Sequence, residues 1–155
     1  MTDTQKKEYK IRLQNKCKDI IEKRIAAIRI AMNEAQASAN NEEKSSAGDK
    51  YETSRAMSHL EKDMHAKQLS VNMKEIESLL SVDCNRLYNS AEKGSLVNCE
   101  AISFFIAAGL GKIVFENETI FLVSPLAPVS KILSGKKAGD IVVFNKEEYT
   151  VRDVY

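Results

Sequence analysis

The sequence predicts an α+β protein in which a long helical hairpin precedes a small sheet domain. Two observations lead to this prediction. The first 80 residues contain one glycine, Gly48, and no proline. After about residue 95, short β-rich runs alternate with turn-forming residues. Because the two patterns occupy separate halves of the chain, we expect an antiparallel coiled-coil hairpin, then a small antiparallel sheet with one short helix.

The first helical run extends from about Gln5 to Ala39. It lacks both residues that break helices, and its apolar residues recur at spacings of three or four, which is the signature of one long amphipathic helix. The predicted apolar stripe consists of Cys17, Ile21, Ile25, Ile28, Met32, Ala35 and Ala39.

The second helical run extends from about Asp49 to Leu80. Its predicted stripe consists of Met57, Leu60, Met64, Leu69, Met73, Ile76 and Leu80. The five-residue step from Met64 to Leu69 breaks the spacing of three or four, so we expect the apolar stripe to shift around the helix there. Neither helix can bury a narrow stripe alone, and the polar connection "NNEEKSSAG" is short, so we expect antiparallel pairing with the connection at the tip.

The remainder of the chain predicts a sheet. Three β-rich runs are present, "LVNCEAISFFIAA", "KIVFENETIFLVSP" and "DIVVFNKEEYTVRDV", with turns expected at Asn117 to Glu118 and at Asn145 to Glu148. The segment "APVSKILSGKKAGD" fits a short helix with Pro128 in its first turn and Gly135 as its C-cap. The core is expected to contain Phe104, Phe105, Phe115, Phe121, Phe144 and Tyr149.

These patterns give three domain ranges. Residues 1–82 form the coiled-coil hairpin with its tip at about 41–52, residues 83–95 form a linker, and residues 96–155 form the sheet domain.

The amino-acid composition indicates the class of protein to expect. Apolar residues make up 43% and charged residues 29%, which is typical of a soluble globular protein. Neither a membrane span nor a signal peptide is evident, so we expect a cytoplasmic location without membrane contact. The cysteines, Cys17, Cys84 and Cys99, match neither a metal motif nor a closed disulfide set, so buried thiols are expected.

The first helix is locally basic. This charge fits either the solvated face of a long helix or a surface that faces nucleic acid or an acidic protein, and charge alone leaves both interpretations open. Residues 1–30 carry four acids, Asp3, Glu8, Asp19 and Glu22, and nine basic residues, Lys6, Lys7, Lys10, Arg12, Lys16, Lys18, Lys23, Arg24 and Arg29.

The segment "GDKYE" at the start of the second helix has two interpretations. Asp49 is a good N-cap, and Glu52 three residues later nearly completes a capping box, with both charges favoured by the helix dipole. The same two carboxylates could also supply oxygen ligands to a hard cation. The two roles compete only if the single Asp49 carboxylate must serve both.

A longer string near the C-terminus carries a family resemblance. The stretch "VSPLAPVSKILSGKKAGDIVVF", residues 123–144, resembles the C-terminal domain of the bacterial Gre transcript-cleavage factors. That family joins an N-terminal coiled-coil hairpin to an FKBP-like domain, so the order of parts agrees over nearly the full length. The matching positions are Ser124, Pro125, Gly135, Lys136, Lys137, Gly139 and Asp140.

The resemblance implies a transcription elongation factor, grouped with DNA-binding proteins, that is not itself an enzyme. It implies that the tip enters the secondary channel of RNA polymerase, where Asp49 and Glu52 share a magnesium ion held mainly by the polymerase and stimulate cleavage of backtracked RNA. It also implies that the seven matching positions lie in or beside the contact with polymerase. We expect a monomer whose basic first helix contacts the RNA 3′ end transiently.

Three alternatives stay open. A second register aligns Tyr51 and Arg55 with the tyrosine and arginine of the family, which puts Ala47 and Lys44 at the positions of the acids and predicts loss of cleavage. The protein could then be a polymerase-binding regulator that occupies the same channel without cleavage. A coiled-coil adaptor unrelated to polymerase, self-associating through its sheet domain, is the third.

Overall fold

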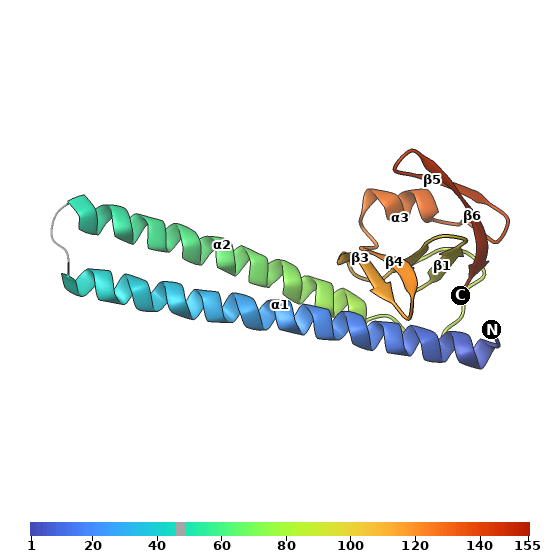
Figure 1. Cartoon of the computed structure of the whole chain (residues 1–155), viewed down its shortest axis with the longest axis horizontal. Coiled ribbons are helices and arrows are strands. Elements are labelled where there is room, and N and C mark those ends of the chain that lie inside the picture. The colour runs from blue at the N-terminus through green and yellow to red at the C-terminus, as the bar shows by residue number, and fades with distance from the viewer. Residues whose placement is uncertain (46–48) are drawn as a thin grey trace. The chain divides into compact units, whose positions relative to one another are not determined.

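A computed structural model describes residues 1–45 and 49–155, with side chains outside 42–51. Two long helices, α1 (Asp3–Ser45) and α2 (Asp49–Leu80), precede the sheet, as Figure 1 shows. This confirms the predicted fold class. The other elements are β1 (Leu96–Cys99), β2 (Ser103–Ile106), β3 (Gly111–Phe115), β4 (Glu118–Val123), α3 (Pro128–Leu133), β5 (Ile141–Phe144) and β6 (Glu147–Val154).

The chain divides into two compact units. The sheet unit contains Met1–Asp19 together with Glu75–Tyr155, and the rod unit contains Ile20–Lys74. The start of α1 and the end of α2 therefore belong with the sheet. The domain ranges expected from the sequence stay a prediction.

The sheet has six strands in the order β3-β4-β2-β1-β6-β5. All neighbouring strands run antiparallel except β2 and β4, which are parallel. The sheet is therefore mostly antiparallel, as the sequence predicts, and this pair is the exception. The reason is that β3 lies at the edge and forms a hairpin with β4, so β4 returns beside β2 in the same direction as β2.

Two tight turns connect the hairpins. Glu116 and Asn117 have φ of +48° and +65°, and Asn145 and Lys146 have φ of +52° and +65°. Two successive positive φ values are the mark of a type I′ turn, which matches the twist of the flanking strands. The second turn lies where the sequence predicts it, and the first is one residue earlier than predicted.

The short helix α3 begins and ends close to its predicted bounds. Pro128 is its first residue, Ser134 is the C-cap, and Gly135 follows with φ of +76°. A positive φ just past a helix end favours glycine, because glycine has no Cβ to clash with the preceding carbonyl.

The sheet buries side chains on both faces. The register places Leu96, Phe105 and Leu122 on one face, where the Tyr9 ring of α1 contacts Phe115. Because side chains alternate along a strand, Val97, Phe104 and Phe121 lie on the other face. That second face forms a core with Leu133 of α3, Val142 of β5 and Val151 of β6.

Within the rod unit, the two helices run antiparallel (Figure 1). The predicted stripe of α1 is confirmed, because its members are buried or half-buried while most of their neighbours along the helix are exposed. Ile21 is fully buried, and Ile25, Ile28, Met32, Ala35 and Ala39 are half-buried.

The predicted stripe of α2 is wrong over most of its length. Met57 and Leu60 are 60% and 68% exposed, and Met64, Met73 and Leu80 are also exposed. The half-buried positions of α2 instead repeat about every 3.5 residues, in phase with the buried Leu79 near its C-terminal end. They are Ile76, Asn72, Leu69, His65, Ser58 and Ser54.

Among the described residues, no helix is both long enough and apolar enough to cross a membrane.

Candidate functional site

The first candidate site is the tip of the rod unit. The helix α2 begins at Asp49, as predicted, and Glu52 lies exposed in its first turn. Gly48, Ala47 and the side chains of Asp49 and Lys44 lie outside the described residues. The predicted pairing of the two carboxylates therefore stays a prediction.

Asp49 and Glu52 are the kind of residue that could supply some of the oxygen ligands of a magnesium ion. Carboxylate oxygens are the ligands that magnesium prefers, and the ion takes six ligands in all. Among the residues that the structure describes, no group of three or more His, Cys, Asp or Glu side chains gathers to hold a metal ion. Asp49 and Glu52 by themselves would leave part of a six-ligand magnesium shell unfilled.

The second candidate site is the segment 124–140 of the sheet unit, which holds the seven matching positions. The Ser124 backbone carbonyl accepts a 2.6 Å hydrogen bond from the Ser130 hydroxyl of α3. The Ser124 hydroxyl in turn accepts a 3.3 Å hydrogen bond from the Leu126 backbone N–H. These contacts hold the segment that leads into α3, which includes the half-buried Pro125.

The segment after α3 is a tightly bonded loop. The Gly135 N–H donates to the Ala91 carbonyl at 2.9 Å, and the Ala91 N–H donates to the Lys136 carbonyl at 2.8 Å. The Lys137 N–H donates to the Asp140 carboxylate at 2.8 Å. Hydrogen bonds to Ala91 and within the loop therefore hold its backbone, while the Lys137 and Asp140 side chains stay exposed.

Gly139 has a conformational role in the same loop. Its φ is +94°, and its N–H donates to the Val151 carbonyl at 2.8 Å. A Cβ at this position would meet no atom within 4 Å. The positive φ, rather than close approach of a neighbour, therefore explains the glycine.

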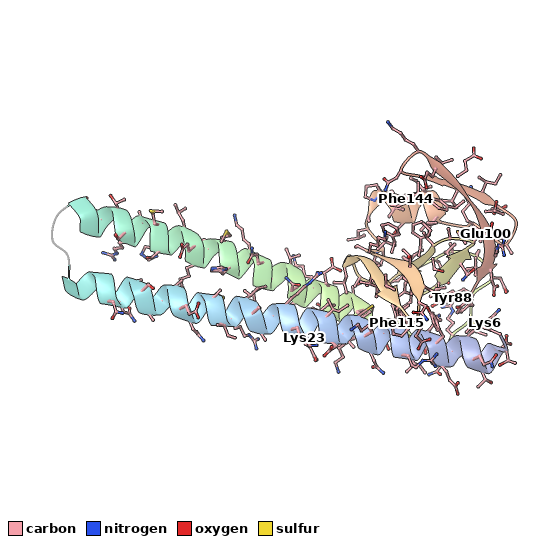
Figure 2. All side chains as sticks on the ribbon, viewed as in Figure 1. Lys6, Lys23, Tyr88, Glu100, Phe115 and Phe144 are labelled. Carbon is pink, nitrogen blue, oxygen red and sulfur yellow. The ribbon has the colours of Figure 1, made fainter. Side chains whose placement is uncertain are left out.

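Lys6, Lys10 and Arg12, at the start of α1, contact other parts of the sheet unit. The Lys6 ammonium lies 2.7 Å from the Asp153 carboxylate of β6. The Arg12 guanidinium donates two hydrogen bonds, of 2.8 and 3.1 Å, to Glu116 in the turn after β3. Figure 2 shows Lys6, Tyr88 and Phe115 where the start of α1 meets the sheet.

Lys10 is the most unusual of these residues. Its side chain is fully buried, and its Nζ donates a 2.9 Å hydrogen bond to the Arg86 carbonyl. The same Nζ lies 4.7 Å from the centre of the Tyr88 ring. Burial lowers the pKa of Lys10 to about 8, because the charged form loses its hydration. This burial was not predicted, because nothing in the sequence distinguishes Lys10 from the lysines around it.

The prediction of buried thiols is confirmed. Cys17, Cys84 and Cys99 are free and buried, and burial raises the pKa of each, to about 12 for Cys17. A raised pKa leaves little thiolate near neutral pH, and the thiolate is the reactive form.

The predicted aromatic core is largely confirmed. Phe104 and Phe105 are fully buried, and the Phe104 ring centre lies 5.3 Å from that of Phe144, which Figure 2 labels in the sheet unit. Phe121 and Tyr149 complete this cluster. Phe115 lies outside it and packs against Tyr9 of α1 instead.

Comparisons with known proteins give one likeness to report. No protein-family model matches the chain, and no curated protein matches it. Among solved structures, the transcription factor Gfh1 is similar with a TM-score of 0.37 and 16% identity, over 89% of this chain and 92% of that one.

Proposed function

We propose that this protein is a Gre-like transcription elongation factor that binds RNA polymerase and stimulates cleavage of backtracked RNA. The observation that carries the proposal is that α2 begins at Asp49 and that Glu52 lies exposed in its first turn. The resemblance of residues 123–144 to the C-terminal domain of the Gre family supports the same assignment.

In this proposal the rod unit carries Asp49 and Glu52 into the polymerase, and the polymerase hydrolyses the RNA. Positions three apart in a helix are neighbours on its surface, so Asp49 and Glu52 belong to one turn of α2. A magnesium ion held mainly by the polymerase would supply an activated water and stabilise the charge that develops on the RNA phosphate. The chain itself would not be an enzyme.

The sheet unit would dock on the polymerase through the segment 124–140. The loop that holds Lys136, Lys137 and Asp140 is fixed by hydrogen bonds within it and to Ala91 and Val151, which supports a preformed surface. A preformed surface loses little conformational entropy on binding, which favours affinity.

The test is a cleavage assay on stalled, backtracked polymerase complexes with the variant Asp49→Asn/Glu52→Gln. We expect RNA cleavage to fall by about 100-fold or more, since loss of a charge-stabilising group has that order of effect. Polymerase binding, measured in parallel, should be unchanged. The matched control is Glu61→Gln/Asp63→Asn, which neutralises two exposed acids further along α2.

Each other outcome of the assay identifies an alternative. Cleavage unchanged by Asp49→Asn/Glu52→Gln would remove the role assigned to the tip acids. Wild-type protein that binds polymerase and slows transcription without cleavage would be a regulator of the same channel. Absence of polymerase binding would favour a coiled-coil adaptor.

A further inference from the structure

One side of α2 is both apolar and exposed. Met57, Leu60, Met64 and Val71 are 60%, 68%, 49% and 58% exposed. They follow one another at spacings of three, four and seven residues, so all four lie on the same side of the helix. We call these four residues the outer stripe. A contiguous apolar surface that stays exposed indicates contact with another protein molecule.

The charges of the rod unit are divided along its length. Because its helices run antiparallel, residues 33–61 make up its tip half, and residues 20–32 with 62–74 make up its base half. The tip half has six acids and three basic residues, a net charge of −3, and the base half has two acids and six basic residues, a net charge of +4. The charged residues of the tip half are Glu34, Glu42, Glu43, Lys44, Asp49, Lys50, Glu52, Arg55 and Glu61, and those of the base half are Glu22, Lys23, Arg24, Arg29, Lys62, Asp63, Lys67 and Lys74.

A second copy of the chain fits both features. The outer stripe is centred on Met64, because Met57 and Val71 each lie seven residues from it. Met64 is also within three residues of the boundary between the two charged halves. A two-fold axis at Met64 would therefore place the two outer stripes against each other and each tip half over the base half of opposite charge. A parallel pair would place like charges together.

The size of the outer stripe indicates how strong such a pair would be. From Met57 to Val71 the stripe is about 21 Å long, at a rise of about 1.5 Å per residue. Four side chains cover much less than the roughly 800 Å² per partner that stable interfaces bury. We therefore expect a weak dimer that forms as concentration rises and is mainly monomeric at low micromolar concentration.

We propose that the outer stripe is a self-association surface, through which two copies of this chain pair antiparallel about a two-fold axis at Met64. The inference goes beyond the proposed function and needs neither the tip acids nor polymerase. Its test contains no polymerase, so its failure is distinguishable from failure of the proposed function.

The first measurement is sedimentation equilibrium of the full chain from about 1 μM to 1 mM, a range that covers weak association. The average mass should rise toward that of a dimer. Met64→Lys places two like charges against each other at the axis and should weaken the dimer about ten-fold or more. Met73→Lys is the matched control, because Met73 is also 49% exposed and lies nine residues, or two and a half turns, from Met64. It should leave association unchanged.

Cross-linking tests the antiparallel orientation. The cysteines of the chain are buried, so the wild type should form no disulfide between copies when treated with diamide, which oxidises two thiols to a disulfide. Met57→Cys and Val71→Cys, mixed in equal amounts with a mass tag on one, should form the mixed disulfide in preference to either symmetric one. Met73→Cys should cross-link no more than the wild type.

The contribution of charge is tested by two substitutions of the same kind. Lys67→Glu makes the base half less positive and should weaken the dimer about three-fold or more. Arg55→Glu changes the charge by the same amount but makes the tip half more negative, so it should strengthen the dimer. Both side chains are exposed, so both variants should fold.

Three results would overturn the proposal. The first is a wild-type chain that stays monomeric over the whole concentration range. The second is equal weakening by Met64→Lys and Met73→Lys, which would place the contact elsewhere. The third is symmetric cross-linking of Met57→Cys in preference to the mixed disulfide, which would make the pair parallel.

Discussion

The helices of the sheet unit and those of the rod unit are packed by different means, although they are continuous in sequence. In the sheet unit, Leu13, Cys17 and Leu79 are fully or almost fully buried. Toward the tip of the rod unit, the protected positions are small or polar, such as Ala35, Ala39, Ser54 and Ser58, and none is fully buried. Burial of large apolar side chains dominates folding free energy. The difference therefore indicates that the helices are most stable next to the sheet.

The exposed apolar residues of α2 extend this contrast. Met57, Leu60 and Met64 recur at spacings of three and four, yet all three lie outside the seam that faces α1. Within the described residues, the amphipathic pattern of α2 and its packing against α1 thus do not coincide. Equivalent substitutions in the two units can test whether their helices contribute differently to the free energy of unfolding.

The largest effect is expected from Leu79→Ala, compared with Leu80→Ala and Leu60→Ala. Leu79 is fully buried, so its truncation should lower the free energy of unfolding by about 2 to 5 kcal/mol. Leu80, its neighbour on the helix, is 53% exposed, and Leu60 in the rod unit is more exposed. Those two should change stability by about 0.5 kcal/mol or less. Urea denaturation measures all three, and equal losses would contradict the contrast between the units.

The next effect is a pH dependence that originates at Lys10. Its pKa is about 8 in the folded chain, below the ordinary value of 10.5, so the unfolded state binds more protons between these pH values. The unfolding free energy should therefore rise with pH across this window, by up to roughly 3 kcal/mol, and the Lys10 contribution should be lowest below pH 8.

Denaturation of the wild type and of Lys10→Met from pH 7 to 10.5 isolates this contribution. The raised pKa of the buried Cys17 acts in the opposite direction above pH 9, since the unfolded thiol loses its proton first. That contribution is common to both proteins and cancels in the difference. Lys16→Met, an exposed control, should keep the wild-type profile. Parallel profiles for the wild type and Lys10→Met would refute a charged, buried Lys10.

A smaller effect is expected from Glu75, where α2 contacts the loop before β3. Its carboxylate accepts a 2.7 Å hydrogen bond from the Gly109 N–H. Glu75→Ala should lower the free energy of unfolding by about 1 kcal/mol, the usual net value of such a bond. Glu77→Ala, at an exposed site two residues away, is the control. If the two variants unfold at the same urea concentration, the bond does not stabilise the sheet unit.

Local sequence patterns predicted much of the secondary structure. The lack of Gly and Pro predicted the two long helices, and the bounds of α2 agree with the structure. Pro128 and Gly135 predicted the position of α3, because both residues act on the backbone beside them. Asn145 predicted a tight turn for the same reason. The candidate tip acids, Asp49 and Glu52, were also predicted from the sequence alone.

Non-local contacts determined the features that the sequence did not predict. The parallel pairing of β2 with β4 depends on where β3 lies in the sheet. The positions of β3 and β5 at the two edges likewise depend on the order of strands in the sheet.

Residue type limits the backbone locally, so the positions of the helices, turns and strands could be predicted from the chain. The face of α2 that meets α1 could not, since the protected positions are in phase with the buried Leu79 and not with the exposed Met57 and Leu60. The tertiary structure also decided that Lys10 is buried, because the cost of removing its charge from water is offset by the Arg86 carbonyl and the Tyr88 ring. Both outcomes depend on residues far apart in the chain.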